Sequence, residues 1–269
     1  MRISRFIDQN RTTHYGVLQE DSSAEVLTGD LFEGLQPTGR IEAVAELLAP
    51  LEPSNILGIG LNYHEHAKET GKDVSENPIL FMKPTASLNH PDADIVLPAC
   101  SVWGPEVDFE AELAVVIGKA ALNVAVESAL DFVLGYTCAN DVSARRWQKH
   151  GGAGQWGRGK GFDTFCPLGP TLVTTYDIPD PQDLQIRCIL NGELMQEGHT
   201  GDMIFSIATL ISELSRDRTI SPGTVILTGT PPGVGVARKP PVFLSEGDVV
   251  TVEIEKIGQL TNTVTDTNQ

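Results

Sequence analysis

Short runs of alternating apolar and polar residues dominate the chain, and clusters of turn residues separate them. Because the side chains of a β-strand point alternately to its two faces, runs of this kind predict strands. We expect strands over residues 2–8, 13–19, 24–27, 54–61, 79–83, 94–97, 109–117, 133–140, 171–174, 184–190, 225–228 and 249–254. Helical spacing is rarer and predicts helices over 41–48, 63–70, 126–129, 143–149 and 203–215. Strands that do not alternate with long helices favour a β-rich α+β fold over a doubly wound parallel sheet.

Two prolines, Pro50 and Pro53, mark a boundary near the first fifth of the chain. The segment before them carries no cluster of catalytic residue types, so we interpret residues 1–53 as a small accessory domain. Residues 54–260 would form the main domain, which carries the candidate chemistry. Residues 261–269 read as a frayed polar tail.

The composition is that of a globular chain with a strongly acidic surface. Asp and Glu outnumber Lys and Arg by 36 to 19, which gives a formal net charge of −17. This charge argues against nucleic acid or an anionic membrane as a main partner. The cysteines show no CxxC motif and no Cys/His cluster, so they predict neither a zinc site nor a disulfide framework. The N-terminus lacks the apolar segment of a signal peptide, and we expect a reducing, cytoplasmic setting.

The stretch Asp108-Phe-Glu110-Ala-Glu112 sets three carboxylates at alternate positions, directly before the apolar run 113–117. Alternate residues of a strand share a face, so these like charges would repel each other at the entrance to a buried strand. A hard divalent cation with oxygen ligands would relieve the repulsion. The alternative is a solvated strand that a neighbouring Lys or Arg balances.

Further candidate residues follow the next apolar strand. Asp141 ends the run 133–140 and can join the carboxylates as a third oxygen ligand, although a helix N-cap is the alternative role. Arg145 and Gln148 are three positions apart on the expected helix 143–149, and they can present one donor surface to an anionic ligand.

A possible acid/base pair lies on the expected helix 63–70. His66 and Glu69 are three positions apart, so the carboxylate can orient the imidazole as in a general base. Lys68 stands where a zinc protease motif needs its second histidine, which excludes that motif. The alternative is a polar helix face exposed to solvent.

The glycine-rich segment 151–161 resembles a phosphate-binding loop, but Gly161 replaces the required Ser or Thr, and the segment follows a predicted helix. We therefore reject nucleotide binding and expect a mobile lid that delivers Lys160 to an anionic ligand. A flexible surface loop is the alternative. Thr230, in the Gly-rich turn after strand 225–228, offers a hydroxyl and an N–H, although an ordinary turn is also possible.

Together these motifs, in this order, resemble the fumarylacetoacetate hydrolase family over residues 56–258. The resemblance rests on the following segments: Gly60-Leu-Asn-Tyr-His-Glu-His66, Phe81-Met-Lys83-Pro84, Asp108-Phe-Glu-Ala-Glu112, Asn140-Asp141-Val-Ser-Ala-Arg145 and Gly229-Thr230-Pro-Pro-Gly233. It is closest to the branch associated with oxaloacetate keto–enol tautomerisation. The resemblance implies stacked mixed β-sheets with short helices, a homodimer, and a site for Mg²⁺ or Mn²⁺.

The resemblance also implies roles for particular residues. Glu110, Glu112 and Asp141 would be the metal ligands, with Asp108 in a structural role. His66 with Glu69 would be the acid/base pair, and Lys160 would add electrostatic help. The substrate would be held by Arg145, Gln148, Lys160 and Thr230.

The chemistry implied is enolisation of a small anionic 2-oxo acid that chelates the cation, which acts as a Lewis acid. The leading hypothesis is a tautomerase of oxaloacetate-like acids. Two alternatives use the same site, namely a C–C bond hydrolase of the acylpyruvate or fumarylacetoacetate type and an oxaloacetate decarboxylase. A remoter alternative is a non-catalytic, metal-stabilised dimeric binding protein.

Overall fold

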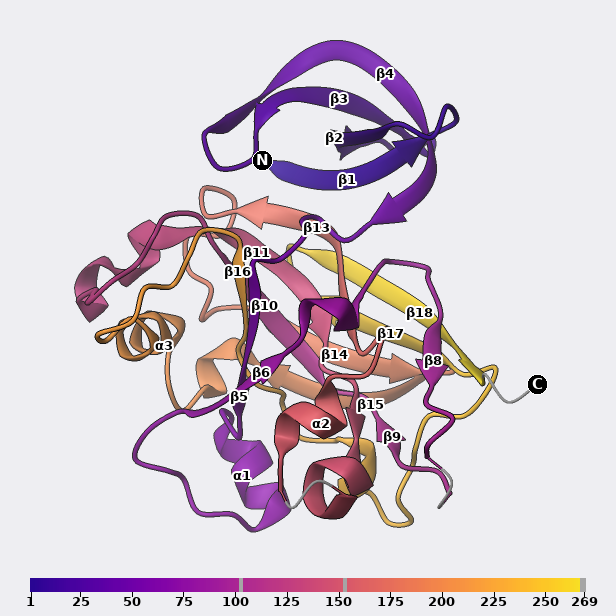
Figure 1. Cartoon of the computed structure of the whole chain (residues 1–269), viewed down its shortest axis with the longest axis vertical. Helices are drawn as coiled ribbons and strands as arrows, with labels where there is room; N and C mark the ends of the chain where they lie inside the picture. Colours follow the sequence, from indigo (N-terminus) through magenta and orange to yellow (C-terminus); the bar gives the residue numbers. More distant parts are fainter. Residues whose placement is uncertain (102–103, 152–153, 267–269) are drawn as a thin grey trace.

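The computed structural model describes residues 1–101, 104–151 and 154–266. Its first four strands are β1 (Arg2–Asp8), β2 (Thr13–Leu18), β3 (Ser23–Asp30) and β4 (Gly34–Leu48). Each pairs antiparallel with two of the others, so they close into a small barrel at one end of the molecule (Figure 1). Phe6, Ala24 and Val26 fill its centre. A separate N-terminal unit is therefore confirmed.

The helix expected over residues 41–48 is wrong, because this segment is the second half of β4. Its residues are good helix formers, such as Ala43 and Glu46. However, the segment pairs with β3 on one side and β1 on the other, and closing the barrel satisfies its backbone donors and acceptors. Tertiary pairing here outweighs local propensity.

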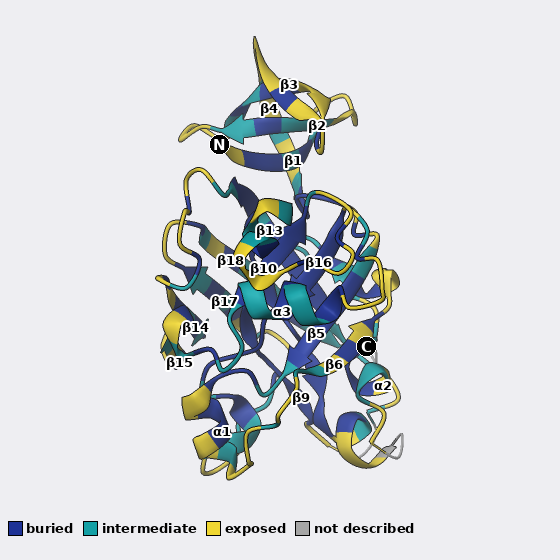
Figure 2. Cartoon of the chain, turned by 90° about the vertical axis from the view of Figure 1, so that its left-hand side faces the viewer, coloured by how far each residue is buried: buried dark blue, intermediate teal, exposed yellow. Residues whose placement is uncertain are grey.

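A large sheet continues from β1 into the main body of the chain. In order across the sheet, it contains β13 (Cys166–Thr174), β11 (Val133–Asn140), β10 (Ala111–Ile117), β16 (Thr224–Leu227), β5 (Asn55–Gly60) and β6 (Ile79–Lys83). The central strand β10 is buried along its whole length (Figure 2). Burial on both faces explains why the run 113–117 is continuously apolar rather than alternating.

A second sheet of five strands packs against this one. Its order is β15 (Glu193–His199), β14 (Gln185–Leu190), β17 (Val249–Ile254), β18 (Gly258–Asp266) and β8 (Ile95–Leu97). Leu113 and Val115 of β10 and Val252 of β17 belong to the shared apolar core. The predicted β-rich α+β fold of stacked mixed sheets is thus confirmed.

The expectation of a frayed tail over residues 261–269 is wrong for residues 261–266, which belong to β18. β18 pairs with β17 and with β8, and alternate side chains at Leu260, Asn262 and Val264 are buried. The residues between them, Thr261 and Thr263, are threonines, which suit a half-buried strand. Residues 267–269 lie outside the described part of the chain.

The longest helices are short: α1 (His64–Thr70), α2 (Trp156–Lys160), α3 (Ile207–Leu214) and the 3₁₀-helix Val126–Phe132. The helix predicted over 143–149 is wrong in its first half. Ser143 and Ala144 form a two-residue strand, β12, with β9 (Val107–Asp108), and a π-helix follows over Trp147–Gly151. In the described residues, no helix is long and apolar enough to cross a membrane.

Candidate active site

A cavity of about 340 Å³ opens at the end of the main body that carries α1 and α2, away from the N-terminal barrel (Figure 1). Segments far apart in the sequence line it. They are α1, β6, the approach to β10, the π-helix, α2 and the loop 234–237. Every predicted site residue lines this cavity except Asp141. The fold therefore brings together residues that the sequence spreads over more than half of the chain.

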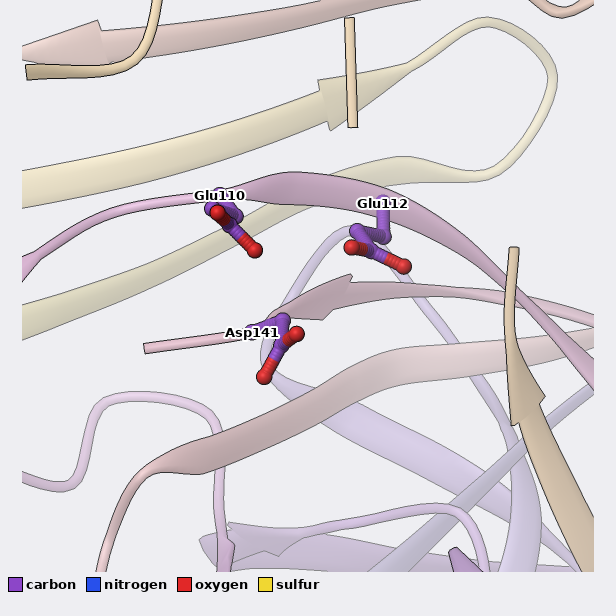
Figure 3. A group of neighbouring side chains, drawn as sticks. All are labelled: Glu110, Glu112 and Asp141. Carbon is purple, nitrogen blue, oxygen red and sulfur yellow. The ribbon is translucent and has the colours of Figure 1, made fainter. Parts of the chain in front are cut away.

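The carboxylates of Glu110, Glu112 and Asp141 point toward one another, and each offers an oxygen within 4.8 Å of the others (Figure 3). The pairing of β10 with β11 produces this arrangement, because Ala111 lies opposite Asn140. Asp141 N–H also donates to the Glu110 carbonyl at 2.9 Å. All three side chains are buried.

The positive groups around the cluster do not balance the negative charge of all three carboxylates. Burial raises the pKa of Glu112 well above its ordinary value, and the nearby Asp141 and Glu110 raise it further. The Gly229 N–H donates to Glu112 Oε2 at 2.7 Å, and among the described residues no Lys or Arg forms an ion pair with Glu112. Glu112 is thus the carboxylate that most needs an added cation.

Lys160 supplies positive charge on the other side of the cluster. Its Nζ donates to Glu110 Oε2 and to Ser143 Oγ, both at 2.7 Å, and also to Asp141. Burial tends to raise the pKa of Glu110, but the Lys160 ammonium and the Arg145 guanidinium outweigh it and hold that pKa below its ordinary value. Burial tends to lower the pKa of Lys160, but Asp141 and Glu110 outweigh it and raise that pKa.

The mobile lid predicted over 151–161 is wrong for its second part, since Lys160 is the buried last residue of α2. The packing of Gly159 explains why a glycine stands at this position. A Cβ at this position would lie 2.4 Å from the backbone nitrogen of Gln148, so only glycine lets α2 pack against the π-helix. Residues 152 and 153 lie outside the described part of the chain.

Arg145 and Asp108 form a second buried pair beside the cluster. Arg145 Nε donates to Asp108 Oδ2 at 2.8 Å, and Arg145 Nη1 lies 2.7 Å from Glu110 Oε1. Asp108 also accepts the N–H groups of Gly235 and Val236, so it fixes the loop 234–237. These contacts are those of a residue with the expected structural role. Asp108 is also not part of the carboxylate cluster.

His66 and Glu69 form a hydrogen-bonded pair on α1, with 3.0 Å between His66 Nδ1 and Glu69 Oε2. The Gly233 N–H donates to the other oxygen, Glu69 Oε1, at 2.9 Å and holds the carboxylate in place. Since Nδ1 is engaged, Nε2 is the nitrogen of His66 left for a ligand in the cavity. Asn62, which precedes this helix, donates to the Thr228 carbonyl at 2.7 Å.

Two buried residues of the site have no predicted role in the sequence. Lys83 Nζ donates to Asp141 Oδ1 at 2.5 Å and to the Phe165 carbonyl at 2.8 Å. Gln196 Nε2 donates to Thr230 Oγ1 at 2.7 Å, and Thr230 in turn donates to the Ala111 carbonyl. Lys83 shares a strand face with buried Phe81, and this alternation could have marked it as a buried lysine.

The donor set fits a hard divalent cation. Glu110, Glu112 and Asp141 offer only carboxylate oxygens, which suit Mg²⁺, Mn²⁺ or Ca²⁺ better than softer metals. The raised pKa of Glu112 is the expected result when such a cluster lacks the charge that would balance it.

A carboxylate cluster of this kind, beside an imidazole–carboxylate pair in one cavity, is typical of metal-dependent enzymes that act on anionic substrates. Residues 55–265 match the family described as fumarylacetoacetate (FAA) hydrolase C-terminal, and the chain belongs to the fumarylacetoacetate hydrolase family. Residues 1–50 match a second family, described as Rv2993c-like, N-terminal. The predicted family and enzyme class are confirmed.

Named relatives agree with this assignment. The chain is 52% identical over 219 residues to oxaloacetate tautomerase fahd2, mitochondrial, of Xenopus laevis, covering 81% of this chain and 68% of the relative. It is 50% identical over 218 residues to oxaloacetate tautomerase FAHD2A, mitochondrial, of Homo sapiens, with the same coverage of both chains.

Solved structures of similar chains extend over the whole length. A 5-carboxymethyl-2-hydroxymuconate delta-isomerase from Mycobacterium smegmatis superposes with a TM-score of 0.85 at 37% identity, covering 99% of this chain and 100% of the other. A fumarylacetoacetate hydrolase from Exiguobacterium antarcticum gives a TM-score of 0.85 at 36% identity, with 99% of each chain covered.

Proposed function

We propose that this protein is a divalent-metal-dependent keto–enol tautomerase of oxaloacetate-like 2-oxo acids. The observation that carries the proposal is the position of the His66–Glu69 pair in the same cavity as the buried carboxylates. Tautomerisation needs one group that moves a proton between carbon and oxygen, and a polarised carbonyl beside it. The names of the relatives from Xenopus laevis and Homo sapiens support oxaloacetate as the substrate.

Each residue of the site has a proposed task. Glu110, Glu112 and Asp141 would hold the cation, which when bound would polarise the carbonyl and carboxylate oxygens of the substrate as a Lewis acid. His66 Nε2 would take the proton from the carbon next to the carbonyl and return it at the oxygen. Glu69 keeps the imidazole in the orientation and tautomer that this requires.

The remaining residues would bind and orient the substrate. Lys160 and Arg145 place positive charge beside Glu110, where they would stabilise negative charge that develops on the substrate oxygen. Gln148 and Thr230 line the same cavity and would position the substrate. Trp156 covers Gly60, where a Cβ would lie 2.2 Å from the indole, and would help to exclude water.

The alternative reactions use the same residues. If His66 activates a water instead of moving a proton on the substrate, the result is hydrolysis of a C–C bond. Similarity to the fumarylacetoacetate hydrolase of Exiguobacterium antarcticum favours this as the second candidate. Decarboxylation of oxaloacetate is a third outcome of the same enolisation.

We propose Mg²⁺ or Mn²⁺ as the metal, a homodimer as the assembly, and division into an accessory domain over residues 1–53 and a catalytic domain from residue 54. We also propose a cytoplasmic location, although the two relatives named above are described as mitochondrial.

The decisive experiment follows the ultraviolet absorbance of enol-oxaloacetate with Mg²⁺, with Mn²⁺ and with EDTA. We expect metal-dependent decay of the enol that exceeds pyruvate release from acylpyruvates measured in parallel. Hydrolysis faster than tautomerisation would favour the hydrolase instead. Decay that EDTA leaves unchanged would reject the metal-dependent mechanism.

A further inference from the structure

Two lysines stand at the solvent end of the active-site cavity. Lys72 follows the C-terminus of α1, where its N–H donates to the Ala67 carbonyl, and Lys149 lies on the π-helix next to Gln148. Both line the cavity, and both are exposed, whereas Glu110 and Glu112 at the other end are buried. The cavity therefore runs from the carboxylate cluster to a positively charged mouth.

These two lysines differ from the other cations of the cavity in their partners. Arg145 and Lys160 are each paired with carboxylates of the cluster. Among the described residues, neither Lys72 nor Lys149 forms an ion pair. In a chain with a net charge of −17, two unpaired lysines at one opening leave a local positive charge free for a ligand.

The surroundings of Lys149 support this interpretation. Partial burial lowers its pKa, and the positive charges of Arg145 and Lys72 lower it further, with Asp108 acting weakly in the opposite direction. The ammonium of Lys72 also lies 5.8 Å from the centre of the Trp156 ring, so it is held over the cavity wall. An anion placed between the lysines would relieve the repulsion between them.

We propose that Lys72 and Lys149 bind the distal carboxylate of a dicarboxylic 2-oxo acid and so select dicarboxylates over monocarboxylates. This inference rests on the proposed function. The first carboxylate and the carbonyl oxygen of the substrate would bind the cation that the buried cluster would hold, and His66 would face the enolisable carbon. The distal carboxylate, on the far side of that carbon, would then point to the mouth of the cavity, which Lys72 and Lys149 line.

The kinetic test compares enol-oxaloacetate with enol-phenylpyruvate, which has no distal carboxylate, in wild type, K72Q, K149Q and the double variant. We expect the double variant to raise KM for oxaloacetate roughly tenfold to a hundredfold, with kcat nearly unchanged, since charged hydrogen bonds have this strength. KM for phenylpyruvate should not change. K68Q is the matched control, because Lys68 is an exposed lysine of α1 that pairs with Glu65 and does not line the cavity.

A binding measurement separates this inference from the reaction itself. Isothermal titration of the Mg²⁺-loaded protein with L-malate and with L-lactate compares two hydroxy acids that differ in the distal carboxylate. Wild type should bind malate more tightly, and the double variant should lose most of this preference. An unchanged preference in the double variant would overturn the inference, even if the enzyme turns over oxaloacetate. Absence of turnover in wild type would reject the proposed function but leave the titration as a test of the lysines.

Discussion

Lys83 Nζ donates a hydrogen bond to Asp141 Oδ1 at 2.5 Å, and the side chains of both residues are completely buried. The same ammonium donates to the carbonyl of Phe165, so the lysine joins β6 to the segment before β13. The second oxygen of Asp141 meets Lys160. Asp141 is thus held between two lysines, and its orientation toward Glu110 and Glu112 does not depend on a metal ion.

Replacing Lys83 with methionine should destabilise the protein strongly. The change leaves Asp141 buried with one cationic partner fewer, and breaking a buried ion pair in this way costs about 3–5 kcal/mol. Urea unfolding followed by circular dichroism measures the loss. K68M is the control, because the exposed Lys68–Glu65 pair contributes at most about 1 kcal/mol. A K83M variant as stable as K68M would show that the buried pair is not needed for the fold.

Replacing Glu112 with glutamine should separate stability from metal binding. The amide keeps an oxygen for the Gly229 N–H but removes a buried charge that Asp141 and Glu110 repel. In EDTA we therefore expect E112Q to have a melting temperature at least as high as that of wild type. Added Mg²⁺ should stabilise wild type more than E112Q, because the variant has lost one anionic ligand. Thermal melts of both proteins with EDTA and with a Mg²⁺ series measure the difference. Equal stabilisation by Mg²⁺ would show that Glu112 does not hold the ion.

Part of this site could be predicted because its residues lie in strong local patterns. Glu110 and Glu112 alternate into an apolar strand, and Asp141 ends another, so their meeting requires only that β10 and β11 pair. His66 and Glu69 are one helical turn apart, and their contact follows from helix geometry alone. Such features follow from patterns of residues that are close in the sequence, and one sequence is enough to show these patterns.

Other parts could not be predicted, because their partners are distant in the sequence. The contact of Gln196 with Thr230 depends on β15, whose pattern is too weak to show a strand. The segment 41–48 is a strand only because the barrel closes around it. Burial of Lys160 depends on the packing of α2 against the π-helix. The glycines permit this packing but do not by themselves predict it. Long-range pairing decided each of these cases.

Replacing Gln196 with alanine should loosen Thr230 and destabilise the fold. Gln196 accepts the Ala111 N–H at 2.9 Å and donates to Thr230 Oγ1 and to the Pro231 carbonyl, and all of these groups are buried. Each buried group left without a partner costs about 1–3 kcal/mol, so we expect a loss of a few kcal/mol in the unfolding free energy. Q185A should stay close to wild type, because Gln185 is exposed on β14. KM for the substrate should rise in Q196A and not in Q185A; unchanged KM would argue against Thr230 as a substrate contact.

Replacing His66 with asparagine should remove the proposed proton carrier while leaving the cation site intact. Loss of a positioned general base typically lowers the rate by about 10²–10⁴-fold, so kcat should fall by this order. E69Q should cause a smaller fall, since it keeps an acceptor for the Gly233 N–H but weakens the hold on the imidazole. Steady-state kinetics with enol-oxaloacetate give kcat, and calorimetric titration with Mn²⁺ should show wild-type affinity in both variants. A wild-type kcat in H66N would show that another residue carries out the acid/base role.

The stability of the protein should fall between neutral and mildly acidic pH, in part because of His90. His90 Nδ1 accepts the N–H of Ala49 at 3.1 Å, so the neutral imidazole joins the end of β4 to the main body. Burial lowers the pKa of His90, and the charge of Arg5 lowers it further. The unfolded chain then takes up a proton at a pH where the folded chain does not. The contribution of His90 is therefore fully present above the unfolded pKa of about 6.5. It declines as the pH falls toward the lower pKa of the folded state and is constant below it.

The matched variant for this effect is H90N, because the oxygen of asparagine can replace Nδ1 as the acceptor and does not titrate. Urea unfolding at intervals between pH 7.5 and pH 5.5, with EDTA present throughout, gives the free energy of unfolding for both proteins. The curve for wild type should fall more steeply with decreasing pH than the curve for H90N. Parallel curves would show that the imidazole of His90 titrates alike in the folded and unfolded chains, and that the loss of stability arises elsewhere.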